Sequence, residues 1–298
     1  SPDADFPIIN SEKGILIFNM EKDFAPGGGD GVTVESIRGG RRPNMVPDYC
    51  EAVLKSSDIK ALEATAQRLT AYAAQNGYNM KAEAGPGQVV IKSYGISAHG
   101  STPEKGQNAI AQVLGFLNSI SLSGEGVREY IRDLAQKIGT ETDGKSLGLD
   151  LEDEVSGKLV FNLGQIELDR SHGKVVINIR YPIKYKGEYV LAKLREALEG
   201  TGITIPDDVY DQPPLYVPED NFMIKKLKKV YEEVTGEEAR LISIGGGTYA
   251  RAIDNAVAFG PLLPGRPELA HEKDEYIDID DLMTITKIYA RAMYSLAE

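Results

Sequence analysis

The stretch KLVFNLGQIELDRSHGKVVINIRYP, residues 158–182, predicts two β-strands joined by a short turn. In its second half, Val175, Ile177 and Ile179 alternate with more polar positions, as they do in a strand that buries one face. Arg180 falls on the polar face of the same strand. The chain is therefore expected to contain a half-buried β-hairpin at this point.

The residues around this hairpin extend it into a larger pattern. The joining turn covers residues 170–173, and its histidine, His172, is expected to be a solvent-exposed turn residue. A helix over residues 187–198 and a strand over ITIPDDVY, residues 203–210, complete a β-α-β pattern.

The remaining chain alternates between helical and strand-like segments. The clearest helix covers residues 58–76, where Asp58 is a candidate N-cap and Gly77 a candidate C-terminal stop. A second helix is expected to begin at Pro103, capped by Ser101 or Thr102. Further helices are expected over 127–138, 221–234 and 279–296, and strands over 15–20, 88–95, 239–243 and 256–260.

The order of these elements predicts two regions. A β/α module of roughly 200 residues precedes an α/β segment of roughly 90 residues, both within the usual size range of domains. The proline-rich stretch YDQPPLYVPED, residues 210–220, is the best boundary between them. A short N-terminal piece is expected to belong with the last segment.

Composition narrows the class of protein. The chain has 298 residues, of which 42% are hydrophobic and 26% charged, so it should bury an ordinary core. Its formal net charge of −12 argues against a nucleic-acid partner, because phosphate binding needs a basic face. The single cysteine, Cys50, cannot form an internal disulfide, and no apolar run reaches the ~18 residues of a membrane span. A soluble, cytoplasmic protein without a membrane partner is expected.

His99, in GISAHGSTPEKG (residues 95–106), is one of only three histidines in the chain. It stands between a strand-like run and the start of a helix, among small residues. A histidine in that position can donate a hydrogen bond to a developing oxyanion. The alternative is a structural or surface histidine, and the residues alone favour that alternative.

Two further segments could carry a site. His271 follows a strand-like run in an acidic loop, where imidazole could bind zinc or manganese, or the loop could simply be solvated. The glycine run in SIGGGTYARA, residues 243–252, could present backbone N–H groups to a carboxylate, or could be a tight turn that needs positive φ.

Together these segments resemble a known family. GISAHGSTPEKGQNAI, IGGGTYARAIDNAVAFGPLLPG and AHEKDEYIDIDDLMTITKIYARAMYSL are similar to segments of the dinuclear-metal dipeptidases and deacylases of the aminoacylase/carboxypeptidase G superfamily. SPDADFPIINSEKG and RRPNMVP add a closer resemblance to the bacterial PepV-type dipeptidases. The resemblance runs through nearly the whole chain in the same order.

The resemblance implies a fold class and a domain organisation. The expected fold is α/β: an α+β lid with ferredoxin-like β-α-β elements, inserted in a zinc-peptidase-like α/β catalytic domain that here lacks its N-terminal part. Residues 1–13 and 209–298 would be pieces of the catalytic domain, and residues 14–208 would be the lid.

The resemblance also implies roles for individual residues. Asp3, or Asp5 if the alignment shifts by two residues, and His271 would bind the two divalent metal ions, zinc or manganese. His99 would stabilise the tetrahedral oxyanion. Two residues and one loop would hold the substrate: Asn44, Arg180 through the substrate's C-terminal carboxylate, and the loop formed by Gly245, Gly246, Gly247 and Thr248.

The sequence lacks a residue pair that enzymes of this family need for catalysis. A two-metal peptidase of this type needs a His-x-Asp pair, whose aspartate bridges the metals, and a Glu-Glu pair that supplies the general base. No His-x-Asp occurs in the sequence, and no histidine precedes His99. The chain is therefore expected to be the C-terminal two-thirds of a dipeptidase, inactive by itself.

The expected function is metal-dependent hydrolysis of dipeptides. An N-acyl amino acid deacylase or desuccinylase of the same superfamily is the nearest alternative. A non-catalytic module that binds peptides through Arg180 and the glycine run is an alternative of another class, and dimerisation through the lid is a third.

Overall fold

The computed structural model describes residues 1–25, 31–269 and 273–298 and divides the chain into two compact units. The larger unit contains residues 14–152 and 158–212, and the smaller unit contains residues 1–13, 153–157 and 213–298. The larger unit is thus inserted within the sequence of the smaller one.

The predicted hairpin lies in the middle of the larger unit's sheet. It consists of β10 (Val160–Leu168) and β11 (His172–Tyr181), paired antiparallel. Val175, Ile177 and Ile179 are completely buried, which confirms the face assigned to the core.

Two side chains of β11 differ from the prediction. Arg180 is only 4% exposed, because the polar face of β11 is also covered. His172 is the first residue of the strand instead of part of the turn, and it lies opposite Asp23 of the neighbouring strand. Its Nδ1 is 2.8 Å from Oδ1 of Asp23. Cross-strand neighbours are close enough to pair in this way.

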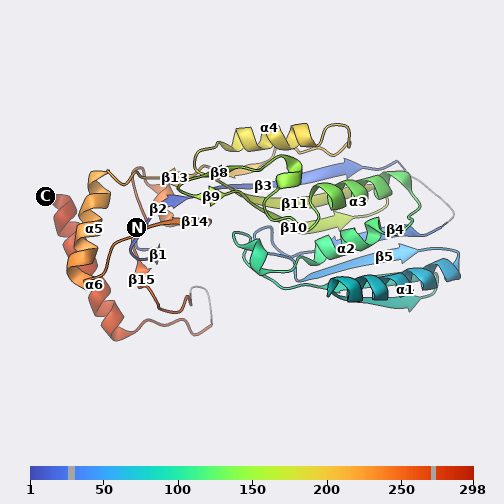
Figure 1. Ribbon diagram of the computed structural model, residues 1–298, viewed down its shortest axis with the longest axis horizontal. Helices are drawn as coiled ribbons and strands as arrows, with labels where there is room; N and C mark the ends of the chain where they lie inside the picture. Colours follow the sequence, from blue (N-terminus) through green and yellow to red (C-terminus); the bar gives the residue numbers. More distant parts are fainter. Residues whose placement is uncertain (26–30, 270–272) are drawn as a thin grey trace. The chain divides into compact units, whose positions relative to one another are not determined.

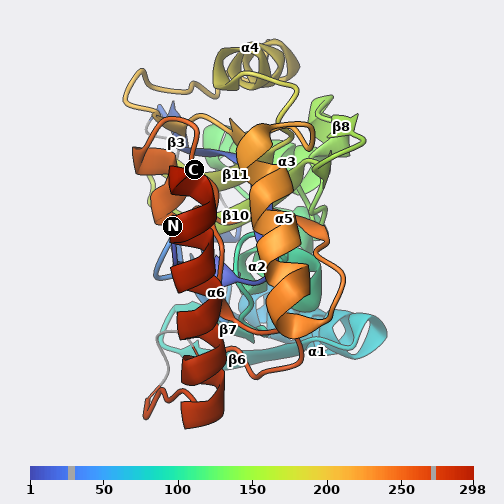
Figure 2. The same ribbon diagram turned by 90° about the vertical axis from the view of Figure 1, so that its left-hand side faces the viewer.

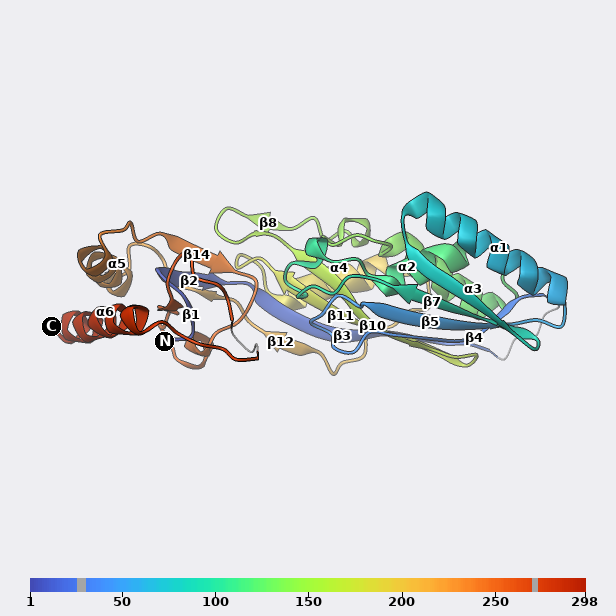
Figure 3. The same cartoon turned by 90° about the horizontal axis from the view of Figure 1, so that it is seen from below.

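The sheet has eight strands in the order β12-β3-β11-β10-β4-β5-β7-β6, with every neighbouring pair antiparallel. The strands not yet described are β3 (Gly14–Asp23), β4 (Thr33–Gly39), β5 (Tyr49–Lys55), β6 (Asn79–Gly85), β7 (Gln88–Tyr94) and β12 (Tyr210–Gln212). Figure 1 shows the helices α1, α2 and α3 lying along this sheet, and Figure 3 shows them over one of its faces.

The helices of the larger unit are α1 (Ile59–Asn76), α2 (Ala109–Asn118), α3 (Glu125–Lys137) and α4 (Gly187–Ala197). Short elements connect them: the 3₁₀ turns η1 (Pro103–Lys105) and η2 (Lys145–Leu147), and the hairpin of β8 (Glu152–Asp153) and β9 (Gly157–Lys158). One hydrophobic core joins all four helices to the sheet.

The β-α-β pattern is present with a shorter last strand than predicted. Helix α4 connects β11 to β12, and β3 lies between these two strands in the sheet. Within the predicted strand over 203–210, only Thr204 forms a bridge, to Glu21, before the pairing of β12 begins at Tyr210. Pro206 has no backbone N–H to donate to a ladder, which explains the interruption.

Helix α1 has the ends that the sequence predicts. The Oδ1 of Asp58 accepts hydrogen bonds from the N–H groups of Lys60 and Ala61 at 2.9 and 3.3 Å. Gly77 adopts φ 68°, a left-handed conformation that glycine takes without strain.

Replacing Asp58 by alanine is expected to destabilise α1 by about 1 kcal/mol, because two N–H groups of the first turn lose their acceptor. Amide hydrogen exchange in the first turn of α1 should become faster. The matched control is Glu63→Ala on the exposed face of the same helix, where no capping bond is lost. Equal exchange rates in the two variants would contradict the prediction.

The helix predicted from Pro103 does not form as one unit. Pro103 begins only the 3₁₀ turn η1, and Gly106 is extended, with φ −108° and ψ −179°. Thr102 makes no side-chain capping bond. Helix α2 instead starts after Asn108, whose Oδ1 accepts from the N–H groups of Ile110 and Ala111. The capping residue therefore lies after the glycine that interrupts the helix.

The smaller unit is built around β2 (Ile8–Glu12), a completely buried strand. It lies between β13 (Leu215–Tyr216), antiparallel to it, and β14 (Leu241–Ile244), parallel to it. A second, two-stranded sheet pairs β1 (Ala4–Asp5) with β15 (Pro261–Leu262). The predicted strand over 256–260 is only an isolated bridge between Ala258 and Ile9.

Two long helices pack against this small sheet. They are α5 (Phe222–Thr235) and α6 (Ile279–Ala297), which lie side by side in Figure 2. Their core residues include Ile224, Tyr231 and Ile288. The short helix η3 (Tyr249–Ala252) follows β14.

Helix α6 is apolar on two faces. One face contributes Ile285, Ile288 and Ala292 to the core. The exposed side chains on the rest of the helix include Ile279, Leu282, Met283, Met293, Tyr294 and Leu296. Several large exposed apolar side chains on one helix often mark a contact with another polypeptide segment. None of the helices in the described part of the chain has the length and apolarity that a bilayer crossing requires.

Candidate active site

The glycine run of the smaller unit contacts a carboxylate that belongs to the chain itself. Because β14 is parallel to β2, the loop after β14 lies beside the end of β2 at Glu12. The backbone N–H of Thr248 donates to Oε2 of Glu12 at 3.1 Å, and the Thr248 hydroxyl donates to Oε1. The predicted anion is thus a carboxylate, but an internal one. The alternative of a positive-φ turn is not seen, since Gly246 has no positive φ.

Arg251 forms a buried ion pair with Glu12 at the same place. Its Nε donates to Oε2 of Glu12, and the side chains are 6% and 0% exposed. The terminal nitrogens of Arg251 donate to the carbonyl oxygens of Pro213 at 2.7 Å, Lys13 at 2.5 Å and Gly246 at 3.1 Å. One guanidinium therefore connects the end of β2, the chain at Pro213 and the glycine run.

Asp3, the predicted metal ligand, is partly exposed and lies near the same loop. Its Oδ2 accepts a hydrogen bond from the backbone N–H of Tyr249 at 2.6 Å. Asp5, the second candidate, has a different environment: burial, and then the nearby Glu268 carboxylate, raise the pKa of Asp5 above its ordinary value. His271 lies outside the described residues.

The donor set for a metal is incomplete within the described part of the chain. No group of three or more histidine, cysteine, aspartate or glutamate side chains there could hold an ion. Asp3 supplies carboxylate oxygen, a ligand type that divalent ions accept, and its Oδ2 is held by a backbone N–H.

His99 of the larger unit is exposed, and its hydrogen bonds define its tautomer. The backbone N–H of Ser101 donates to Nδ1 of His99 at 3.3 Å, and the Ser101 hydroxyl lies 2.7 Å from the same nitrogen. Because Nδ1 accepts from the backbone, the proton of the neutral ring resides on Nε2. The imidazole therefore presents an N–H donor at Nε2.

The predicted substrate residues of the larger unit lie around Gly100. The N–H of Gly100 donates to the carbonyl oxygen of Asn44 at 2.7 Å. A Cβ on Gly100 would lie 3.0 Å from the Asn44 backbone and 3.1 Å from Oδ1 of Asn178. Nε of Arg180 donates to that same Oδ1 at 3.2 Å. His99, Asn44 and Arg180 are thus brought into one neighbourhood around Gly100, where a side chain would be tightly crowded.

The sequence did not identify three residues of these hydrogen-bond networks, namely Glu12, Arg251 and Asn178. Glu12 is the charged last residue of β2, whose sequence is IINSE, and Arg251 follows Thr248 by three residues. Both were visible as charged residues, but only Arg251 is near the glycine run in the sequence. Asn178 occupies the same strand face as Arg180, two residues earlier. Their pairing depends on contacts between segments distant in the chain, which residue spacing does not show.

Comparison with known proteins agrees with the family resemblance of the sequence segments. The sequence model of Peptidase family M20/M25/M40 matches residues 12–295. A Bacillus subtilis protein named "Putative dipeptidase YtjP" is 39% identical over 300 residues, and a Staphylococcus haemolyticus protein named "Putative dipeptidase SH1171" is 31% identical over 299 residues. These alignments cover 100% and 99% of this chain, which spans 63% of the length of either relative.

Among solved structures, the aminoacylhistidine dipeptidase of Vibrio alginolyticus matches with a TM-score of 0.51 and 14% sequence identity. The match covers 99% of this chain and 64% of that one. At this identity the likeness concerns the fold, and it confirms the predicted fold class, an α/β catalytic domain with a lid.

Proposed function

Because the chain belongs to Peptidase family M20/M25/M40, we propose that it forms the lid and the C-terminal part of the catalytic domain of a metal-dependent dipeptidase. The larger unit would be the lid, and the smaller unit the catalytic-domain part. SPDADFP and RRPNMVP favour the PepV type within the family. The arrangement of His99, Asn44 and Arg180 around Gly100 is the observation that carries the proposal.

His99 would stabilise the oxyanion that forms on the scissile carbonyl. Its ring is held through Nδ1 by Ser101, so that Nε2–H is the donating group. A donor fixed before the reaction starts stabilises developing charge without reorganisation. His99 therefore acts on the transition state more than on the bound substrate.

Arg180 and Asn44 would hold the substrate. Asn178 fixes the Nε end of the Arg180 guanidinium, which leaves the orientation of the planar fork determined. A buried guanidinium of fixed orientation suits the C-terminal carboxylate of a dipeptide, which it can bind through two parallel hydrogen bonds.

In the smaller unit, the glycine run would contribute backbone donors to the substrate. Since the N–H of Thr248 already donates to Glu12, this role would fall to the backbone of Gly245, Gly246 and Gly247, with Thr248 holding the loop in place. Asp3 and His271 would each bind a divalent ion, zinc or manganese. Bound ions would supply Lewis-acid activation of the peptide carbonyl.

We propose that the general base and the remaining metal ligands come from a polypeptide segment that corresponds to the part of the relatives outside the match. The exposed apolar face of α6, from Ile279 to Leu296, would pack against that segment. The chain by itself would then be inactive. Cys50, a completely buried thiol whose pKa is raised by burial, fits a reducing cytoplasm.

The complete enzyme is expected to hydrolyse dipeptides, to lose this activity on chelation and to regain it with zinc or manganese. Steady-state kinetics with a dipeptide and with matched N-acetyl and N-succinyl amino acids test this. A higher kcat/KM for the acyl substrates would replace our proposal with a deacylase.

Calorimetry with the 298-residue chain gives an independent test. A chain that only supplies part of an active site should bind dipeptides weakly when no metal is added. Micromolar dipeptide binding without metal, together with no hydrolysis by the longer protein, would favour the non-catalytic peptide-binding module.

A further inference from the structure

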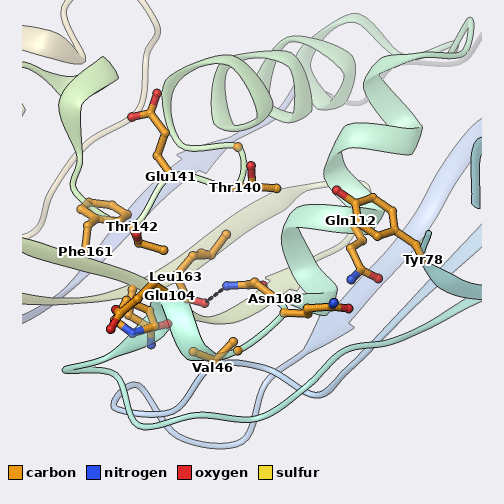
Figure 4. A pocket seen from close by; sticks show the side chains of 15 residues that line it. Val46, Tyr78, Glu104, Asn108, Gln112, Thr140, Glu141, Thr142, Phe161 and Leu163 are labelled. Atoms are coloured by element: carbon orange, nitrogen blue, oxygen red, sulfur yellow. Dashed lines mark hydrogen bonds between the residues drawn. The ribbon is translucent and has the colours of Figure 1, made fainter. Parts of the chain in front are cut away.

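The larger unit contains a cavity of about 370 Å³ that the proposed dipeptidase mechanism does not use. It is lined by residues of η1 and the segment after it, by the start of α2, by the loop after α3 and by the start of β10. Figure 4 shows Asn108, Gln112 and Tyr78 on one side of it and Thr140, Glu141 and Thr142 on the other. Its volume is at the lower end of the range for small-molecule sites, about 300–1,000 Å³.

One buried polar atom at this cavity has no partner. Asn162 is 2% exposed, and its Nδ2 donates to the carbonyl oxygens of Pro43 and Met45 at 2.8 and 3.0 Å. Because both acceptors are carbonyls, the amide cannot be turned around. Its Oδ1 is the one buried side-chain nitrogen or oxygen atom of the described residues without a hydrogen bond. An unpaired buried acceptor is costly, so it favours a ligand that brings a donor.

The charged side chains at the cavity all have the same sign. Glu104 and Glu141 are among the fifteen lining residues described, and none of the fifteen is lysine, arginine or histidine. Glu141 already accepts from the N–H of Ser146 at 2.9 Å and from its hydroxyl, but a carboxylate can accept up to about four hydrogen bonds. The negative electrostatic potential of these two carboxylates favours a bound cation and disfavours a bound anion.

The remaining lining is apolar. Val46, Tyr78, Phe161 and Leu163 provide aliphatic and aromatic surface between the polar groups. A ligand that matches the whole cavity therefore has an N–H donor with positive charge at one end and a compact apolar body at the other.

From these observations we infer that the cavity is a binding site for a primary ammonium ion with a small apolar substituent. The ammonium group pairs with the two glutamates and reaches Asn162 Oδ1 after a small side-chain shift, since that atom is buried before binding, and the substituent packs on the apolar lining. The site is separate from the ring of His99, although Pro103, Glu104 and Gly106 follow His99 closely in the sequence and line the cavity.

The test uses the 298-residue chain, ¹⁵N-labelled, with 2-phenylethylammonium and butylammonium as probes. Dissociation constants on the order of 1 mM or tighter are expected for ligands of this size. Backbone amides that line the cavity, such as those of Gly106, Gln107 and Thr142, should shift. The neutral 2-phenylethanol should bind several-fold more weakly, and 3-phenylpropionate should not bind.

Two variants locate the interaction. Glu104→Gln should weaken ammonium binding about two- to fivefold, as loss of one partly exposed ion pair does. Thr140→Phe, at an exposed loop position, should fill the cavity and abolish binding. Glu63→Gln on α1, which also removes one exposed carboxylate, is the matched control and should bind as the unmodified chain does.

The inference is overturned if neither ammonium probe shifts the amide signals of the cavity at a concentration ten times the expected dissociation constant. It is equally overturned if 2-phenylethanol binds as tightly as the ammonium probes. It is also overturned if Thr140→Phe leaves binding unchanged. Since binding is measured without turnover, failure here leaves the proposed dipeptidase function untouched.

Discussion

Replacing His99 by alanine in the complete enzyme is expected to lower kcat by about 10²–10³-fold, as loss of one oxyanion donor does elsewhere. KM should change much less. The reason lies in the orientation of the ring: Ser101 holds Nδ1 through its N–H, which places the ring proton on Nε2, the atom proposed to donate to charge that exists only in the transition state. Steady-state kinetics with a good dipeptide substrate provide both constants.

The chain offers a matched control for this prediction. His172 belongs to the same unit, but its Nδ1 is paired with Asp23 at the end of β11. His172→Ala should leave kcat within about twofold, as expected for a substitution outside the catalytic machinery. His99→Asn keeps a side-chain N–H donor and should recover part of the loss. An unchanged kcat in His99→Ala, or a loss that appears only in KM, would remove His99 from its proposed role.

Local signals in the sequence were sufficient where neighbouring residues alone determine the structure. The ends of α1 are an example, because Asp58 and Gly77 act on backbone groups within a few residues of themselves. The apolar face of β11 could also be predicted, because the alternation of apolar and polar residues within the strand shows which side chains point into the core. The same reasoning failed at Pro103, where Gly106 interrupts the helix and Asn108 provides a stronger cap than Thr102.

Distant contacts limited what could be predicted of the site. Arg180 was placed on the polar face of β11, and alternation cannot reveal that this face is covered as well. The prediction that the glycine run holds a ligand carboxylate stays untested; what the structure shows is an internal carboxylate, Glu12, which lies more than 230 residues away and meets Thr248 because β14 pairs with β2. Roles for Asn44, Arg180 and Asp3 came from the family resemblance and remain proposals.

The ion pair of Glu12 and Arg251 is expected to be the most sensitive structural feature of the smaller unit. Glu12→Gln would leave the Arg251 charge buried without its carboxylate, and breaking a buried pair by removing one partner costs roughly 3–5 kcal/mol. Of the two Thr248 bonds, the glutamine carbonyl could still accept one, but the amide nitrogen that replaces the other oxygen cannot accept. Amide hydrogen exchange in β2 and β14, measured in the 298-residue chain, should accelerate on the order of 10²–10⁴-fold.

Two comparisons separate the ion pair from a general effect of removing charge. Glu219→Gln breaks the exposed pair with Lys228 in the same unit and should change exchange in β2 very little. The double variant Glu12→Leu with Arg251→Met removes both buried charges, so it should be less destabilised than the sum of its single variants. If the two single substitutions were additive, the charges would not be interacting, and the connection of β2 to the glycine run would have to rest on the backbone pairing of β2 with β14 alone.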